Sequence, residues 1–275
     1  MARTLPSGSD EANISVGANH PFMLTPEHIF QRAVANHAKV GIGLGEDSRK
    51  VLRSVRDAER NGYARTVTFD SAADMVSALR NGEVDAVVRG DLSANQAMSE
   101  VKSQFSLDHL LRAALMQPKG GRMFFLAPVG VDEGWSVEQK LEFVRYSASL
   151  FRQLGIPMRA GALSGGRMGD IGRSVEVDRS IREAMEVERR GREEGFDVEH
   201  CQILIEEAVC VKNLVIAPDG ITGNLIFRTM HLVDGCVSMG APILNLDRVF
   251  IDTSRAKRCY ADSIALASAL ANRGK

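Results

Sequence analysis

The residues best suited to chemistry lie near the carboxyl end of the chain, in the segment 252–258, which reads DTSRAKR. The segment follows the apolar run 249–251 and combines two hydroxyl groups with three cationic side chains. Hydroxyl, guanidinium and ammonium donors together are suited to binding a phosphate or a carboxylate. We therefore predict an anion site in which Ser254 and Arg255 contact the substrate. Asp262 follows a few residues later, and it could act as a general base or simply cap the last helix.

Two further segments carry candidate anion ligands. Residues 164–170 (SGGRMGD) follow a predicted strand, and such a glycine-rich turn can offer free backbone N–H groups beside a fixed cation. Ser164, Gly166 and Arg167 are candidate ligands on this basis, although a plain surface turn fits the pattern equally well. Arg89 follows the predicted strand 84–88, at the end of the strand where α/β sheets bind their ligands.

The glycine-rich run 41–45 (GIGLG) is not a dinucleotide-binding motif, because Glu46 occupies the position of the third glycine and would repel a pyrophosphate. A tight strand-to-helix turn is the favoured interpretation. The six histidines and four cysteines show no metal-ligand spacing, so we predict no metal site.

The overall composition indicates an ordinary globular protein. The chain has 275 residues, of which 44% are apolar and 25% charged, and this length fits one large or two modest domains. A net charge of −1 and an aromatic content of 5% argue against nucleic-acid binding. The sequence has no secretory signal pattern and no long apolar run, so we expect a cytoplasmic protein that does not bind membranes.

Short apolar runs alternate with amphipathic segments, which predicts an α/β fold with a mainly parallel sheet. The predicted strands lie near 40–44, 66–69, 84–88, 123–126, 158–163 and 214–218. The predicted helices lie near 25–37, 47–61, 71–81, 93–100, 136–155, 176–194 and 260–273. Residues 219–224 follow the predicted strand 214–218 at its carboxyl end.

The order of the motifs resembles that of the phosphate acetyl- and butyryltransferases. The matching segments are 38–49, 84–90, 160–164, 214–228, 240–244 and 252–255. Within that superfamily, the short length and the motif GNLIFRTMHLVDG at 223–235 are most similar to a group from archaeal methanogens. This group is called methanogenesis marker protein 4, or methyltransferase Mtx subunit X.

The resemblance implies two three-layer α/β domains with an interdomain cleft. Residues 25–118 and 248–275 would form the first domain and residues 119–247 the second, after an N-terminal extension at 1–24. It also implies a homodimer and a transferase that binds a small anionic substrate in the cleft. No cofactor would be tightly bound, and coenzyme A or another thiol coenzyme would be the co-substrate. The alternatives are a methyltransferase, an accessory subunit associated with methyl-transfer enzymes, and a non-catalytic ligand-binding protein.

Carried over by position, Ser254 and Arg255 match the Ser-Arg pair that holds the reacting groups, and Gly223 and Asn224 match the Gly-Asn turn. The Asp that accepts the thiol proton in the acyltransferases would fall at position 261, which is alanine here, and Asp262 comes one position later. A shift of one position on a helix turns a side chain by about 100°. The resemblance thus predicts a retained fold in which the acyl-phosphate chemistry is altered or lost.

Overall fold

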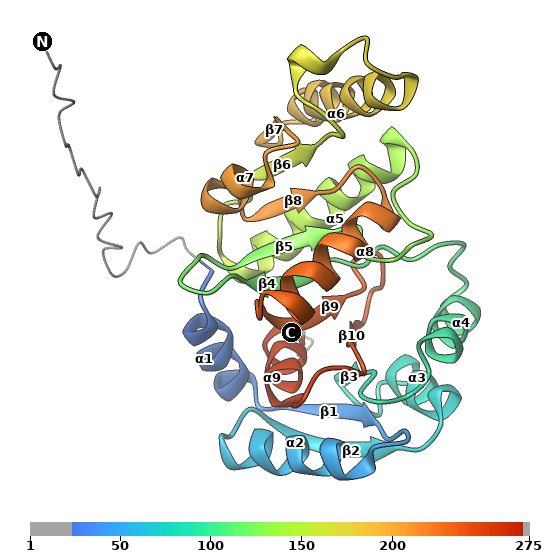
Figure 1. Cartoon of the computed structure of the whole chain (residues 1–275). Helices are drawn as coiled ribbons and strands as arrows, with labels where there is room; N and C mark the ends of the chain where they lie inside the picture. Colours follow the sequence, from blue (N-terminus) through green and yellow to red (C-terminus); the bar gives the residue numbers. More distant parts are fainter. Residues whose placement is uncertain (1–23, 272–275) are drawn as a thin grey trace, which may run out of the picture.

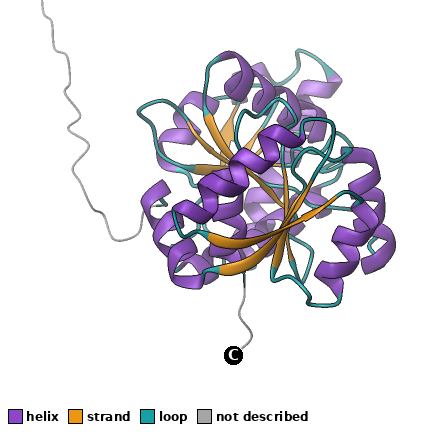
Figure 2. Cartoon of the chain, turned by 90° about the horizontal axis from the view of Figure 1, so that it is seen from below, coloured by secondary structure: helices purple, strands orange, loops and turns teal. Residues whose placement is uncertain are grey.

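The computed structural model describes residues 24–271, and the predicted extension at 1–24 lies outside this range except for its last residue. Within the described residues, ten strands form a single twisted sheet with helices on both faces (Figures 1 and 2). The strands are β1 (Ala38–Gly43), β2 (Ala64–Phe69), β3 (Ala86–Val88), β4 (Ala114–Gln117), β5 (Phe124–Ala127), β6 (Ala160–Leu163), β7 (Val198–Gln202), β8 (Leu214–Ile216), β9 (Val237–Pro242) and β10 (Val249–Asp252). The helices are α1 (Pro26–Asn36), α2 (Ser48–Arg60), α3 (Ala72–Arg80), α4 (Ala94–Phe105), α5 (Val137–Leu154), α6 (Val175–Glu193), α7 (Ile205–Val211), α8 (Gly220–Arg228) and α9 (Ala261–Leu270), with the helical turns η1 (Met168–Asp170) and η2 (Thr229–Val233).

The sheet has two parallel ends and an antiparallel centre. Its order is β2-β1-β3-β10-β9-β4-β5-β8-β6-β7. The first four strands in this order are parallel to one another, as are the last four. Between them, β9 and β4 run antiparallel to their neighbours. The predicted α/β class with mainly parallel strands is confirmed, and the two parallel ends belong to one continuous sheet. The predicted domain boundaries remain a prediction.

The helices cover the two faces of the sheet differently. On one face, α1, α2, α5, α6 and α9 pack on a continuous apolar core. On the other face the core is divided: α3 and α4 pack over Val87 and Phe250, whereas α7 and α8 pack over Phe124 and Val215. The alternation of side chains along each strand assigns these residues to the divided face. The helix layer is therefore interrupted near the centre of the sheet, where β10 meets β9.

Local capping signals position several elements as predicted. The Thr25 side chain accepts a hydrogen bond from the His28 amide at the start of α1, and Pro26 is the first residue of that helix. Ser136 caps α5, which ends at Gly155 with φ 72°, a conformation that favours glycine. None of the helices within residues 24–271 is long and apolar enough to cross a membrane.

The segment 219–224 begins a helix, α8, that the sequence did not predict. Asp219 caps α8 by accepting a hydrogen bond from the Thr222 amide at 2.8 Å, and the helix begins at Gly220. Gly220 and Gly223 have no room for a β-carbon, because it would meet the backbone carbonyls of Gly130 and Pro128. These glycines therefore let α8 pack closely on the loop after β5.

Candidate anion site at the centre of the sheet

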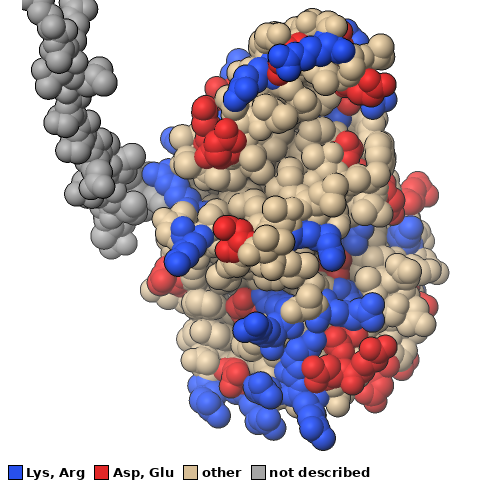
Figure 3. Space-filling view, viewed as in Figure 1, with Lys and Arg blue, Asp and Glu red and all other residues tan. Residues whose placement is uncertain are grey.

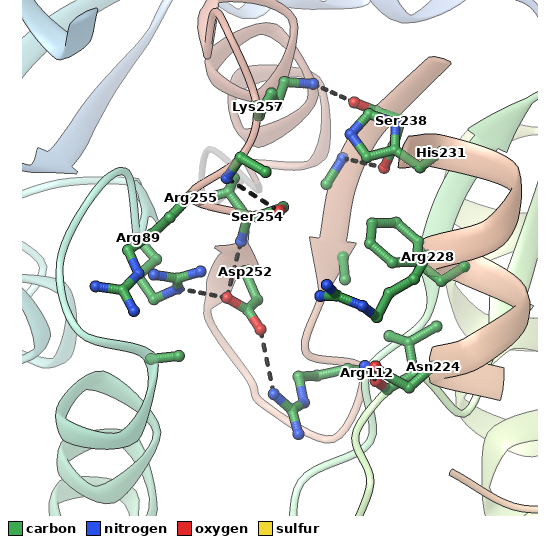
Figure 4. A pocket seen from close by; sticks show the side chains of 18 residues that line it. Arg89, Arg112, Asn224, Arg228, His231, Ser238, Asp252, Ser254, Arg255 and Lys257 are labelled. Carbon is green, nitrogen blue, oxygen red and sulfur yellow. Dashed lines mark hydrogen bonds and ion pairs between the residues drawn. The ribbon is translucent and has the colours of Figure 1, made fainter. Parts of the chain in front are cut away.

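A cavity of about 370 Å³ opens on the divided face, between α8 and the loop that follows β10 (Figure 4). Four of the predicted site residues line it: Ser254, Arg255, Arg89 and Asn224. They come from segments far apart in the sequence, which the sheet order brings together because β3 is next to β10. Figure 3 shows Lys and Arg side chains gathered across the lower half of the face seen in Figure 1, the half that contains β1, β3 and β10.

An acidic residue, Asp252, joins two arginines at the cavity wall. Arg89 Nε donates to Asp252 Oδ1 at 2.6 Å, and Arg112 Nη1 donates to Oδ2 at 3.2 Å. The side chains of Arg89 and Asp252 are only 4% and 15% exposed. Burial alone would raise the pKa of Asp252, but the guanidinium groups of Arg89 and Arg112 outweigh it and lower the pKa. Asp252 is therefore a fixed carboxylate and a weak proton acceptor.

Arg112 has a second carboxylate partner in Glu133. Arg112 Nε donates to Glu133 Oε1 at 2.5 Å, and the backbone amides of Arg112 and Gly130 donate to Oε2. Burial raises the pKa of Glu133, although the nearby Arg112 opposes the change. Arg112 also donates to Asp132, so each of its guanidinium nitrogens already has an acceptor within the protein. Arg89 differs, because its Nε and Nη1 are engaged while Nη2 has no acceptor among the described residues.

Lys257 lines the cavity, and Asp262 lies next to it without reaching the cavity wall. Lys257 Nζ donates to Asp262 Oδ2 at 2.7 Å and to the backbone carbonyl of Ser238. Asp262 Oδ1 accepts a hydrogen bond from the Ser263 amide in the first turn of α9. The N-cap position belongs to Tyr260, so the alternative in which Asp262 is the cap is wrong. The role of Asp262 as a base stays a prediction, and the ion pair with Lys257 makes that carboxylate less available.

Two cations at the cavity remain unpaired once these contacts are counted. Arg228, on α8, and Arg255, after β10, are exposed and form no salt bridge among residues 24–271. The charge of Arg255 still helps to lower the pKa of Asp91. Figure 4 shows Arg228 projecting from α8 into the cavity, while Arg255 extends from the opposite side. Ser254 Oγ accepts a hydrogen bond from the Ala256 amide at 3.2 Å, and its own O–H has no acceptor among the described residues. Two guanidinium groups and a hydroxyl donor thus remain available to a ligand.

Gly223 and Asn224, at the start of α8, pack against the loop that follows β5. Asn224 lines the cavity, but Asn224 Nδ2 donates to the backbone carbonyl of Val129 at 2.7 Å. Gly223 is buried against the carbonyl of Pro128 and does not line the cavity. The pair therefore lets α8 pack against the loop after β5.

The predicted anion loop at 164–170 lies elsewhere. Ser164 lines a different hollow. Helix α8 contributes Thr222 and Ile226 to this second hollow, whereas Asn224 lines the cavity around Ser254 and Arg255. The amides of Gly165, Arg167 and Met168 donate to the side chains of Ser180, Asp170 and Gln202, respectively. The expectation of free backbone N–H groups is therefore wrong for these three amides. Gly166 and Arg167 do not line the cavity around Ser254 and Arg255.

The glycines at 41–45 also serve packing. A β-carbon on Gly43 would meet the carbonyl of Arg89, and one on Gly45 would meet the carbonyl of Asp91. Asp91 in turn accepts hydrogen bonds from the Asp47 amide at 2.7 Å and from Lys50 Nζ at 3.2 Å. The turn after β1 thus supports the loop that carries Arg89.

Three charged or titratable residues of the cavity were not singled out in the sequence: Arg112, Arg228 and His231. Arg228 and His231 follow Asn224 by four and seven positions, a spacing that places residues on one face of a helix. That periodicity could have identified them, had the segment been expected to be helical. Arg112 lies just before β4, a strand that the sequence did not predict.

The fold defines the class of the molecule, an α/β protein with the fold of the phosphotransacylases. A branched-chain phosphotransacylase from Enterococcus faecalis superposes with a TM-score of 0.67 at 16% identity, over 85% of this chain and 98% of that one. A phosphotransacetylase from Streptococcus pyogenes also gives 0.67, at 14% identity, over 90% of this chain and 98% of that one. These similarities show the fold. No protein-family model matches the chain.

The chain belongs to the family named methyltransferase mtx subunit X. The Methanosarcina mazei protein of that name is 40% identical over 268 residues, which covers 90% of this chain and 96% of that protein. An uncharacterized methyltransferase from Methanopyrus kandleri is 39% identical over 254 residues, covering 85% of this chain and 99% of its own length. The family that the motifs indicated is confirmed.

Proposed function

We propose that this protein is a transferase that binds a small phosphate-bearing substrate in the cavity between α8 and the loop after β10. The observation that carries the proposal is the pair of unpaired guanidinium groups, Arg228 and Arg255, in a cavity whose other cations are already paired with Asp252, Glu133 or Asp262. A dianionic group between them would form charge-assisted hydrogen bonds. The phosphotransacylase fold and the methyltransferase names of the relatives both support group transfer.

Each residue around the cavity has a distinct task in this proposal. Arg228 and Arg255 bind the phosphate oxygens, and the Ser254 hydroxyl donates to the oxygen on which charge develops. Arg89 offers Nη2 to the ligand while Asp252 holds its Nε. Because Asp252 keeps this guanidinium in place before the substrate binds, its reorganisation adds little to the reaction barrier. A thiol coenzyme such as coenzyme A is the proposed acceptor of the transferred group.

A second candidate function follows from the names of the relatives. A protein named as a methyltransferase subunit suggests a chain that transfers a methyl group or assists a methyl-transfer enzyme. Exposed apolar side chains on α8 and η2, namely Leu225, Leu232 and Val233, offer a surface for a protein partner or for the expected homodimer. The homodimer, the cytoplasmic location and the lack of a tightly bound cofactor stay predictions.

Thermal unfolding with added ligands tests the proposed function. Inorganic phosphate and acetyl phosphate should raise the melting temperature, because a ligand at 100 times its Kd stabilises the native state by about 2.7 kcal/mol. The Arg255→Ala and Arg228→Ala variants should lose this stabilisation. Arg60→Ala is the matched control, since Arg60 is an exposed arginine on α2 and does not line the cavity.

The outcomes separate the candidate functions. If neither anion raises the melting temperature, or if Arg255→Ala responds like the wild type, the proposed site is wrong. If only Arg167→Ala lost the rise in melting temperature with added anion, the anion site would lie in the loop at 164–170. Stabilisation by S-adenosylmethionine, with none by phosphate, would favour methyl transfer.

A further inference from the structure

A histidine, His231, lines the same cavity as Ser254 and Arg255. It lies in η2, a π-helical turn that continues α8 directly after Arg228. Single π-helical turns attached to α-helices are frequent at functional sites, because they change the direction in which side chains project. Figure 4 shows His231 beside Ser238, farther along the same helical segment as Arg228.

The structure assigns one tautomer to the neutral ring of His231. Nδ1 lies 2.7 Å from the backbone carbonyl oxygen of Cys236. A carbonyl oxygen only accepts hydrogen bonds, so Nδ1 must carry the hydrogen, and the lone pair of the neutral ring is then on Nε2. The ring of Phe227 lies against the imidazole at a centroid distance of 5.4 Å. Nε2 has no hydrogen-bond partner among residues 24–271, so the ring is oriented and keeps a basic nitrogen available.

The two carboxylates that could compete for this role are already engaged. Asp252 is held by Arg89 and Arg112, which lower its pKa. Asp262 is paired with Lys257 and does not line the cavity. Among the described residues that line the cavity, His231 is thus the one side chain with a neutral basic nitrogen and no partner on it.

We propose that His231 is the general base of the transfer reaction, an inference that rests on the proposed function. The thiol proton moves to Nε2 while the sulfur electron pair forms a bond to the acyl carbon of an acyl phosphate. The bond between that carbon and the phosphate oxygen breaks, and phosphate leaves with the bonding electrons, held by Arg228 and Arg255. The hydrogen bond from Nδ1 to the Cys236 carbonyl stabilises the resulting imidazolium.

Several ionisable groups lie on the elements that line the cavity with His231. Arg228 comes from α8, Arg255 and Lys257 come from the loop after β10, and Asp234 and Cys236 lie between η2 and β9. Burial raises the pKa of the Cys236 thiol to about 11, so Cys236 stays neutral over the range in which a histidine titrates.

The variant His231→Asn tests the role of Nε2 with little change in structure. The amide nitrogen of asparagine can replace Nδ1 as the donor to the Cys236 carbonyl, whereas nothing replaces Nε2. With acetyl phosphate and coenzyme A, kcat for thioester formation should fall by about 10²- to 10⁴-fold. The rise in rate with pH that deprotonation of the base causes should disappear, and added imidazole should restore part of the rate. His109→Asn is the control, because His109 is paired with Glu142 away from the cavity.

A second measurement does not depend on turnover. Nitrogen NMR of the histidine side chains, with the His231 signals assigned by their loss in His231→Asn, should show hydrogen on Nδ1 and a bare Nε2 when the ring is neutral. Inorganic phosphate should shift these signals and leave those of His109 in place.

The possible results distinguish the inference from the proposed function. Hydrogen on Nε2, or a wild-type rate and pH profile in His231→Asn, overturns the inference even if Arg255→Ala has lost phosphate binding. A wild-type protein that binds phosphate but forms no thioester overturns the thiol step. A wild-type protein that binds no phosphate overturns the proposed function itself.

Discussion

The ion pairs around Asp252 support a quantitative prediction for the variant Asp252→Asn. Asparagine has nearly the same volume, so the change removes the charge with little loss of packing. The amide oxygen of asparagine can still accept a hydrogen bond from either Arg89 or Arg112. The amide NH₂ group then faces the other guanidinium, and two donors cannot form a hydrogen bond with each other. Arg89 is only 4% exposed and cannot recover its hydration by turning outward.

The expected loss of stability follows from this burial. Removing one partner of a buried ion pair costs about 3–5 kcal/mol, because the remaining charge is left without compensation. We expect Asp252→Asn to lower the free energy of unfolding by an amount in this range. An exposed pair is worth far less, so Asp57→Asn is the control: Asp57 contacts Arg60 at 3.9 Å and is 39% exposed. That substitution should cost less than about 1 kcal/mol.

Urea unfolding followed by circular dichroism measures both values, and its dependence on pH tests their origin. The pKa of Asp252 is lowered in the folded protein, so its carboxylate contributes stability that is fully present above the pKa of an unfolded Asp, about 3.9. That contribution is lost as the pH falls toward the folded pKa. The difference between wild type and Asp252→Asn should therefore be constant near neutral pH and shrink below about pH 4. Equal costs for Asp252→Asn and Asp57→Asn, or a difference that does not shrink in acid, would refute the reasoning.

Two further substitutions test the packing and the surface charges. Gly90 has φ 61°, and a β-carbon there would meet the carbonyl of Gly43, whereas Gly82 has φ 74° and open space around it. In urea unfolding, Gly90→Ala should therefore cost more than the roughly 1–3 kcal/mol of backbone strain expected for Gly82→Ala; equal costs would show that the close approach is unimportant. Arg145 forms exposed pairs with Glu138 and Glu194, so Arg145→Ala should cost less than about 1 kcal/mol, and the cost should vanish in 1 M salt. A cost that persists at high salt would contradict this assignment.

Elements with strong local signals could be predicted from the sequence. The Thr25 cap and Pro26 define the start of α1, and the αL residue Gly155 defines the end of α5. These signals involve neighbours within one or two turns, so no knowledge of the tertiary structure is needed to recognise them. The parallel pairing of β1 with β2 and β3 likewise follows from strands that alternate with helices.

The centre of the sheet could not be predicted in the same way. β4 and most of β9 are buried on both faces, so they lack the alternation of apolar and polar residues that identifies a strand. The start of α8 contains Gly220 and Gly223, which weaken a helix in isolation. They are present because the helix must approach the carbonyls of Gly130 and Pro128, a contact that a local pattern does not reveal.

The same reason explains which site residues could be found. Ser254 and Arg255 were identified by a dense local cluster and by a family resemblance. Arg112 contacts Asp252, which lies 140 residues away, so its position at the cavity depends on the sheet order. His231 has no neighbour in the sequence that marks it as a base, and its assignment depends on the hydrogen bond to the Cys236 carbonyl and on the cavity that it lines.

The cavity contains two kinds of arginine, and the loss of their interactions should affect stability and anion binding differently. Arg89 is buried, Arg112 is largely buried and both are paired, so the loss of their partner Asp252 should lower the free energy of unfolding. Arg255 is exposed and forms no salt bridge among the described residues, so Arg255→Ala should leave the free energy of unfolding within about 0.5 kcal/mol of wild type while it removes anion binding. A chain with nearly balanced charge can therefore hold an anion, because folding neutralises some cations and leaves others without a partner. If Arg255→Ala instead destabilised the apo protein as much as Asp252→Asn, this separation would be wrong, and Arg255 would belong to the folded framework.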